Sequence, residues 1–376
     1  MTTRGETPPL RVLARYLLKL GTVGFGGPIA LVGYMQRDLV DRLHVVTENE
    51  FKDAVAFAQV APGPLAAQVA MYCGWLRGRV LGATVAAILF VLPSFAMVLG
   101  LSFLYLRYNG LPWMQGAFYG IGAAVIAIIL RSAAKLTRAT LSSDWTLWGI
   151  AIANALATVW QSAEVVPLIL AGGVVMVAIR SRVGSGLTRA LLVGGVGALP
   201  SLPPVVQLFV YFAKAGLVVF GSGLAIVPFL HGGVVQQYHW LTEQQFVDAI
   251  AVSMITPGPV VITVAFMGYL VAGFGGATAA AVGIFFPIWL ITVVAAPHFG
   301  RVAHNVALRA FVAGVSAGAT GAIAGAAVVI GRRAVHDAFT LAVALLTLIM
   351  IVRVKRVPEP LLILTAGVLG ILVRRS

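Results

Sequence analysis

Residues 19–64 read KLGTVGFGGPIALVGYMQRDLVDRLHVVTENEFKDAVAFAQVAPGP, and residues 214–259 read KAGLVVFGSGLAIVPFLHGGVVQQYHWLTEQQFVDAIAVSMITPGP. Aligned without a gap, 18 of these 46 positions are identical. The shared positions include a Phe-Gly pair at 25–26 and 220–221, and a Pro-Gly-Pro triplet at 62–64 and 257–259. Two unrelated apolar segments would share only a handful of positions, so the chain contains one structural unit twice.

The similarity continues with small gaps toward the end of the chain. Leu92-Pro93 corresponds to Phe286-Pro287, and Asp144 corresponds to Asp337. We therefore predict a first repeat at 10–182, a second repeat at 205–376, and a connector at 183–204 that is interrupted by Gly and Pro residues.

The composition places both repeats in a lipid bilayer. Hydrophobic residues make up 60% of the 376 residues, charged residues make up 10%, and the mean hydropathy is +0.98. Soluble domains carry about 25% charged residues, whereas a membrane-spanning helix needs about 20 mostly apolar residues. The net charge of +14 fits basic clusters in cytoplasmic loops, such as Arg131, Lys135 and Arg138. An electropositive entrance for anions is a second interpretation of such clusters.

Each repeat has the same order of apolar segments. Two pairs of short segments, interrupted at Gly and Pro, precede two long apolar runs, which are 80–106 and 112–130 in the first repeat. No alternating strand pattern is sustained, so we expect an all-α, polytopic membrane bundle with broken or re-entrant helices. Arg77 and Arg79 correspond to a neutral stretch at 271–276, and this difference in loop charge favours two inverted repeats.

The four helix breaks carry the chemistry that the sequence offers. Glycine ends a helix because it accepts left-handed dihedral angles, and proline is tolerated in the first turn of the next helix. A break inside a membrane leaves backbone N–H groups that lipid cannot satisfy, and a helix N-terminus favours negative charge. Paired breaks in the two halves of a transporter indicate a substrate site near the midplane. The alternative is that these residues only permit close helix crossing.

The predicted oxyanion site comprises the four breaks, the polar residues beside them and two lysines that recur in register. Its residues are Phe25, Gly26, Gly27, Pro28, Gln59, Pro62, Gly63, Pro64, Gln68, Phe220, Gly221, Ser222, Gly223, Pro257, Gly258, Pro259, Thr263, Lys19 and Lys214. A buried lysine would balance a divalent anion, whereas a lysine at the membrane interface would extend to the headgroups. The sequence leaves both roles open.

Asp53 and Asp248 also recur in register. They are candidates for coupling transport to an ion, because acids inside membranes often serve proton relays. The simpler interpretation is a charge near a helix N-terminus, because residues 47–50 and 242–245 have the pattern of helix caps.

Several function classes find no support in the sequence. Cys73 is the single cysteine and no histidine has metal-ligand spacing, so we expect no disulfide, no metal and no cofactor. The basic residues do not gather on a polar domain, which argues against nucleic-acid binding. The acids do not converge as an enzyme's would, and the Gly-x-x-x-x-Gly-Lys-Ser/Thr motif for ATP is absent.

The quoted segments resemble the chromate transporter family. The resemblance rests on the Phe-Gly-Gly-Pro at 25–28, the Thr-Glu-x-Glu-Phe-x-Asp at 47–53, the Gln-Val-Ala-Pro-Gly-Pro at 59–64, and a second copy at 220–259. It covers about residues 10–376 and implies the two-domain, long-chain form of the family. Members are thought to expel chromate as secondary carriers, and an exchange with sulfate-like anions has been considered. Repeat two has Ser222-Gly223 for Gly27-Pro28 and Met254 for Gln59, so the halves are expected to contribute unequally.

We therefore expect a multi-pass protein of a bacterial-type inner membrane that moves chromate, or a similar tetrahedral divalent oxyanion such as sulfate. It would not be an enzyme. Its partners would be the anion and the lipid bilayer, and a homodimer remains an open option. An oxyanion-selective channel, or a carrier for a different inorganic anion, is the alternative. A carrier without an ATP motif takes its energy from an ion gradient, a counter-anion or the membrane potential.

Overall fold

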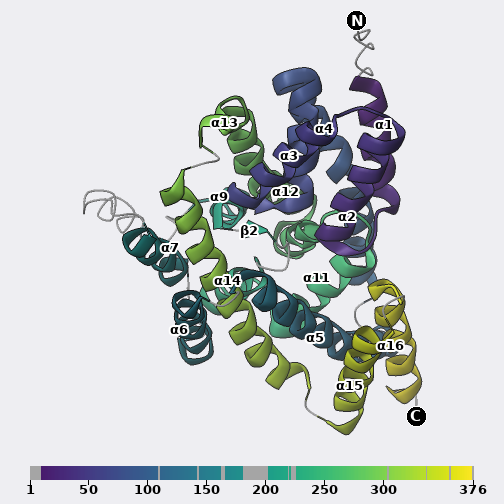
Figure 1. Ribbon diagram of the computed structural model, residues 1–376. Coiled ribbons are helices and arrows are strands. Elements are labelled where there is room, and N and C mark those ends of the chain that lie inside the picture. The colour runs from purple at the N-terminus through teal and green to yellow at the C-terminus, as the bar shows by residue number, and fades with distance from the viewer. Residues whose placement is uncertain are drawn as a thin grey trace, which may run out of the picture.

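The computed structural model of the protein is a bundle of helices (Figure 1). It describes residues 10–108, 111–141, 144–161, 166–180, 202–218, 220–221, 226–302, 305–335, 337–354 and 357–374. Among these residues the strands are β1 (Gly63–Pro64) and β2 (Phe220–Gly221), which pair only with each other. The all-α class expected from the sequence is confirmed.

The helices of the two repeats follow the same order along the chain. The first repeat contains α1 (Leu10–Val23), α2 (Gly27–Met35), the π-helix Gln36–Arg42, α3 (Glu48–Val60), α4 (Leu65–Tyr108), α5 (Pro112–Thr140), α6 (Trp145–Gln161) and α7 (Val166–Arg180). The second contains α9 (Pro204–Val218), α10 (Val227–Leu230), the π-helix His231–Gln237, α11 (Glu243–Ile255), the 3-10 turn Val260–Ile262, α12 (Thr263–Ala295), the 3-10 turn Ala296–His298, α13 (Phe299–Val302), α14 (Val306–Ala334), α15 (Ala338–Arg353) and α16 (Glu359–Arg374).

Threonines cap the equivalent helices α3 and α11. The Thr47 hydroxyl accepts a hydrogen bond from the Glu50 amide at 3.2 Å, and the Glu50 carboxylate accepts one from the Thr47 amide at 2.8 Å. Thr242 and Gln245 make the same reciprocal pair in the second repeat. Each box satisfies two N–H groups that a helix start leaves open, and the cap patterns read from the sequence are confirmed.

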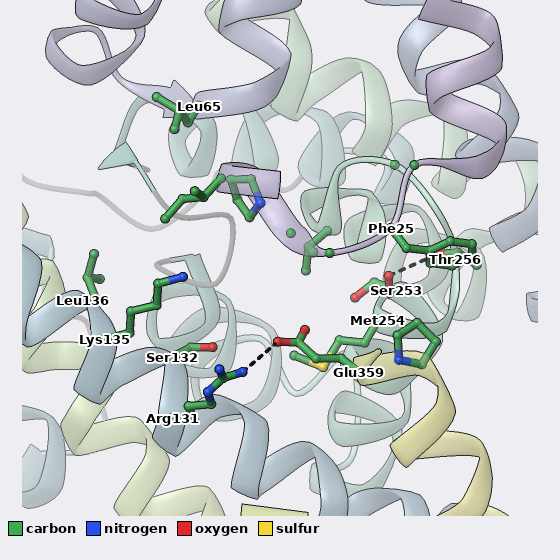
Figure 2. A pocket seen from close by; sticks show the side chains of 18 of the residues that line it. Phe25, Leu65, Arg131, Ser132, Lys135, Leu136, Ser253, Met254, Thr256 and Glu359 are labelled. Carbon is green, nitrogen blue, oxygen red and sulfur yellow. Dashed lines mark hydrogen bonds and ion pairs between the residues drawn. The ribbon is translucent and has the colours of Figure 1, made fainter. Parts of the chain in front are cut away.

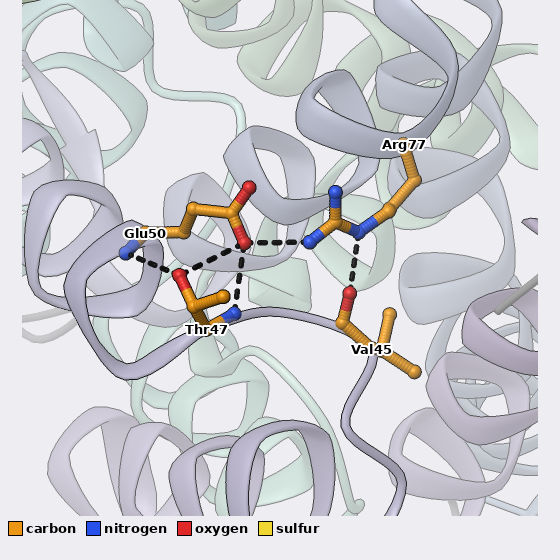
Figure 3. Close-up of polar contacts among 4 residues, drawn as sticks. All are labelled: Val45, Thr47, Glu50 and Arg77. Atoms are coloured by element: carbon orange, nitrogen blue, oxygen red, sulfur yellow. Dashed lines mark hydrogen bonds and ion pairs between the residues drawn. The ribbon is translucent and has the colours of Figure 1, made fainter. Parts of the chain in front are cut away.

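The first arm of α4 lies antiparallel to α3. Arg77 Nη2 lies 2.6 Å from Glu50 Oε2, and Arg77 Nε donates to the Val45 carbonyl (Figure 3). The Phe57 and Tyr72 rings also meet, with centroids 5.1 Å apart. Because Glu50 lies at the start of α3 and Arg77 lies near the end of this arm, the two segments form a helical hairpin whose tip is the 62–64 break. This is the re-entrant element that the sequence predicts.

α4 and α12 each fold back at a two-residue kink. The kink residues are Gly78 and Arg79 in α4, and Ala272 and Gly273 in α12. Beside the first kink, a Cβ added to Gly74 would lie 2.3 Å from the Gly82 carbonyl oxygen. A Cβ added to Gly268 would lie 2.3 Å from the Gly276 carbonyl oxygen. Glycine pairs at equivalent places therefore let both arms pack backbone to backbone.

The second arms of α4 and α12 run in opposite directions. Trp289 Nε1 donates to Thr84 Oγ1 at 3.0 Å. Thr84 lies just after the kink of α4, whereas Trp289 lies near the end of α12. Equivalent helices that run antiparallel are related by a twofold axis in the membrane plane, as inverted repeats require.

Ring contacts across the two repeats show the same symmetry. The ring centroid of Tyr105, near the end of α4, lies 5.1 Å from that of Phe266 in the second repeat. The ring centroid of Phe299, just after the end of α12, lies 6.3 Å from that of Tyr72 in the first repeat. The end of the long helix in each repeat thus packs on the helix that follows the Pro-Gly-Pro break of the other repeat. The inverted arrangement predicted from loop charges is confirmed.

Four of the described helical segments are long and apolar enough to cross a membrane. They are Leu65–Tyr108, Pro112–Thr140, Val260–His298 and Val306–Arg332, and shorter apolar helices accompany them. Large apolar side chains face outward, among them Trp145 and Trp160 at 87% and 90% exposure. Lipid accepts such a surface and water does not, so the protein is a multi-pass membrane protein.

The glycine contact inside α4 predicts a selective loss of stability. Gly74→Ala places a Cβ against the Gly82 carbonyl, so the two arms must separate; overpacking of this kind costs about 1–3 kcal/mol. Gly100→Ala, on the same helix with no atom within 4 Å of its added Cβ, is the matched control. Thermal unfolding followed by size-exclusion chromatography in detergent should show a lower midpoint for Gly74→Ala only. Equal midpoints for the two variants would contradict the backbone contact.

Candidate functional site: a cavity at the interrupted helices

Each repeat has two helix breaks, one at its Phe-Gly pair (25–26 or 220–221) and one at its Pro-Gly-Pro triplet (62–64 or 257–259), and we call these breaks the Phe-Gly and Pro-Gly-Pro tips. The tips meet across the two repeats. Gly63 pairs with Phe220 and Pro64 with Gly221 in a short parallel ladder. On the other side of the pseudo-twofold axis, the Gly258 amide donates to the Gly24 carbonyl at 2.8 Å. Each Phe-Gly tip therefore contacts the Pro-Gly-Pro tip of the opposite repeat, and backbone groups that lipid could not satisfy find partners there.

Buried polar side chains hold the two Pro-Gly-Pro tips. Gln68 is fully buried and its Nε2 donates to the Pro62 carbonyl at 2.6 Å. Ser94 Oγ donates to the Pro257 carbonyl at 2.7 Å. At Gly258 the φ of +97° is one that L side chains rarely adopt, and an added Cβ would lie 1.9 Å from Ser94 Oγ. This tip therefore requires glycine.

A cavity of about 400 Å³ lies beside the tips. The first residues of several helices line it: Gly27 and Pro28 of α2, Leu65 of α4, Val260 before α12, and Glu359 of α16. No side chain caps the start of α2 or of the turn at Val260. Helix N-termini carry free N–H groups and partial positive charge, so their convergence favours an anion.

Basic side chains of α5 form another wall of this cavity. Arg131, Ser132 and Lys135 of α5 line the cavity, and Glu359 at the start of α16 faces Arg131 (Figure 2). Arg131 Nη1 lies 3.7 Å from Glu359 Oε1. Lys135 enters no ion pair within 4 Å in the described part of the chain. The cavity thus offers one paired and one available cation.

The two repeats contribute unequally to the lining. Gln59 and Met254, which correspond in the repeat alignment, both line the cavity, as do Leu65 and Val260. At the spacing that pairs Asp144 with Asp337, however, Arg131 and Lys135 fall on Ala324 and Val328. Among the described lining residues, the cationic side chains therefore come from the first repeat alone. The two halves thus contribute unequally in α5 and α14 as well as at the helix breaks.

Six of the residues predicted from the sequence line the cavity, namely Phe25, Gly26, Gly27, Pro28, Gln59 and Gly258. Others form or support the tips beside it, namely Pro62, Gly63, Pro64, Gln68, Pro257, Pro259 and the backbone of Phe220 and Gly221. Thr263 is buried and donates to the Ala249 carbonyl at 2.8 Å, so it joins the two arms of its hairpin. Ser222 and Gly223 lie outside the described residues.

The two recurrent lysines and the two recurrent aspartates lie outside the cavity lining. Lys19 lines a separate space on the other side of the first tip, and Lys214 is half-buried on α9. Asp53 is exposed on α3. Asp248 is 2% exposed and accepts hydrogen bonds from the Tyr105 hydroxyl and Gln244 Nε2, each at 2.8 Å. The two aspartates occupy equivalent places in the repeats but differ in burial.

Arg131 and Lys135 line the cavity but are not among the individual site residues predicted from the sequence. The sequence offers two interpretations of their basic cluster, a cytoplasmic loop or an electropositive entrance for anions. In the structure both residues belong to α5, which continues to Thr140. The spacing of four residues between Arg131 and Lys135 is the available signal, since it places both on one face of a continued helix.

The fold and the cavity define the class of the protein: a multi-pass membrane transporter built from two inverted repeats. The chain belongs to the chromate transporter family, whose sequence pattern matches residues 12–177 and 206–371.

Named relatives agree with this assignment. The chain is 49% identical to the chromate transport protein of Cupriavidus metallidurans, over 97% of this chain and 93% of that protein. It is 48% identical to the probable chromate transport protein of Synechococcus elongatus, over 96% and 95%, and 32% identical to the chromate transport protein of Pseudomonas aeruginosa, over 86% and 82%. No solved structure matches the chain. These relatives are transporters, so the protein is a transporter rather than an enzyme.

The Arg131–Glu359 pair predicts how the cavity responds to loss of its acid. Glu359→Gln removes a negative charge and releases Arg131, so sulfate should bind several-fold more tightly in isothermal titration of the detergent-solubilised protein. Asp144→Asn is the control, because Asp144 pairs with Arg180 away from the cavity. An unchanged or weaker affinity for sulfate in Glu359→Gln would argue against this cavity as the anion site.

Proposed function

We propose that the protein is a secondary carrier that expels chromate, or a similar tetrahedral divalent oxyanion such as sulfate, across a bacterial-type inner membrane and so confers chromate resistance. The observation that carries the proposal is the cavity in which helix N-termini converge with Arg131 and Lys135. The relatives supply the substrate, since two are chromate transport proteins and one is a probable chromate transport protein.

The charges around the cavity suit a divalent anion. Arg131 and Lys135 carry two positive charges, and Glu359 offsets one of them. One positive side-chain charge remains, and the partial positive charges at the N-termini of α2, α4 and α16 add to it. A doubly negative ion would complete the balance, whereas a cation would meet only Glu359, which already faces Arg131.

The inverted repeats support alternating access. Because each Phe-Gly tip contacts the opposite Pro-Gly-Pro tip, a movement of one repeat against the other would separate one pair of tips while the second pair stays closed. Rocking of this kind would open the cavity to each side of the membrane in turn. It needs no nucleotide, and a proton is one candidate for the coupling ion.

Asp248 and Asp53 stay candidates for coupling. Asp248 is the buried member, held by Tyr105 and Gln244 where the two repeats pack together. A carboxyl group at this place would change the packing between the repeats when it gains or loses a proton. Asp53 is exposed, so the two aspartates would not have equal roles.

A transport assay with matched variants tests the proposal. Wild-type protein in liposomes should take up labelled chromate saturably, show counterflow, and be inhibited by unlabelled sulfate. Arg131→Gln and Lys135→Gln should each lower chromate uptake about tenfold or more, because each removes a charge from the site. Arg138→Gln, on the same helix but outside the cavity lining, should transport like the wild type.

Two results would point elsewhere. Wild-type vesicles that move no tested oxyanion would overturn the proposal. Flux far above carrier rates, without counterflow, would instead identify an oxyanion channel that shares the same electropositive helix ends.

A further inference from the structure

A second space, of about 690 Å³, lies between α1 on one side and α2 with the π-helix Gln36–Arg42 on the other; these segments form a hairpin whose tip is Phe25-Gly26. Gly24 and Phe25 line both this space and the cavity at the tips. The Phe-Gly tip of the first repeat therefore lies between the two spaces. We call the space between the arms the vestibule.

The vestibule is strongly basic. Its lining includes four cationic side chains, Arg15, Lys19, Arg37 and Arg42, and one carboxylate, Asp38. Asp38 pairs with Arg37 at 3.0 Å and with Arg42 at 3.4 Å. No ion pair within 4 Å among the described residues involves Arg15 or Lys19, which lie one turn apart on α1. The acid therefore offsets only part of the positive charge.

Tyr16 lies beside Asp38 on the wall of the vestibule. Its side chain is 8% exposed and its hydroxyl is buried. The exposed cationic side chains of Arg15 and Lys19, rather than this hydroxyl, are therefore the groups that the vestibule offers to an anion.

In the equivalent hairpin of the second repeat, the described residues pack aromatic rings at the corresponding place. Tyr211, which corresponds to Tyr16, donates to the Phe229 carbonyl at 2.9 Å. Its ring stacks on Phe229, and Tyr238 stacks on Trp240. A Cβ on Gly233, which corresponds to Asp38, would lie 2.1 Å from the Tyr211 hydroxyl. Aromatic packing thus fills the place that charged residues line in the first repeat.

Charge also distinguishes the two ends of the molecule. The turns at the base of the first repeat's hairpins carry Arg37, Arg42, Arg77 and Arg79. The corresponding residues of the second repeat are Gly232, Gln237, Val271 and Gly273. By the positive-inside rule, the end that holds the vestibule faces the cytoplasm.

We propose that the vestibule is a loading site where a tetrahedral divalent oxyanion from the cytoplasm binds between Arg15 and Lys19 before it passes Phe25 into the cavity. This inference rests on the proposed function and adds to it a second anion site on the cytoplasmic side. It gives Lys19 a role that Lys214 does not share. The basic lining raises the local concentration of anions beside the cavity. Phe25 separates the anions in the vestibule from the transport site in the cavity.

Sided vesicles test the loading site. In everted vesicles, whose cytoplasmic face is outside, Lys19→Gln should raise the KM for labelled chromate about fivefold and leave the maximal rate near that of the wild type. The increase should shrink in high salt. Right-side-out vesicles should show an unchanged KM. Arg11→Gln, on the same helix but outside the vestibule lining, is the control and should match the wild type on both sides.

A second arm separates a free oxyanion from a lipid phosphate, because both present the same chemistry to these side chains. The effect of Lys19→Gln on KM should persist in phosphatidylcholine liposomes. An effect that appears only after phosphatidylglycerol is added would overturn the loading site and assign the vestibule to a lipid headgroup.

Phe25→Ala tests the separation of the two spaces. Loss of the ring should join them, so that downhill chromate flux rises and counterflow falls, whereas Phe25→Leu should keep most of the counterflow. Wild-type counterflow in Phe25→Ala would contradict the proposed barrier.

The outcomes also separate the two proposals. If the loading site alone is wrong, the wild type transports chromate and Lys19→Gln has the wild-type KM on both sides. If the proposed function is wrong, the wild type itself shows no saturable oxyanion transport in either orientation.

Discussion

Backbone N–H and C=O groups at interrupted helices must find partners inside the membrane, and this requirement organises the protein. The break at 62–64 pairs with β2, and the break at 257–259 bonds through Gly258 to Gly24. Each tip thus has partners in the opposite repeat, and Gln68 of the same repeat also donates to the Pro62 carbonyl. The repeats therefore hold each other together at the same place where their helices begin again, and the free helix ends that remain border the cavity.

Close glycine contacts make this arrangement possible. α4 and α12 must fold back to start the next crossing, and Gly74 with Gly82, like Gly268 with Gly276, brings the arms together at backbone distance. In lipid such packing replaces the hydrophobic drive that joins helices in water. The inverted symmetry then follows from two equivalent hairpins that approach the midplane from opposite ends of the molecule.

The sequence predicts this framework because its signals are local and occur twice. The Pro-Gly-Pro triplets, the threonine caps and the apolar runs each specify a short segment, and the repeat doubles the evidence for every one. Arg131 and Lys135 are different, since they occur once and follow an apolar run whose end resembles a helix end. Lys19 and Lys214 recur in register, yet Lys19 shares a basic space with Tyr16 and Asp38, while aromatic packing occupies the corresponding region of the other repeat. Such differences depend on contacts between distant segments.

An experimental density map of the protein with bound selenate, a tetrahedral divalent oxyanion with a strong anomalous scatterer, tests the central claim most directly. The account predicts a selenium peak in the cavity, within hydrogen-bond reach of the first amides of α2 and of the Arg131 or Lys135 side chain. A cavity without a peak at saturating selenate, in a protein that transports selenate, would contradict it.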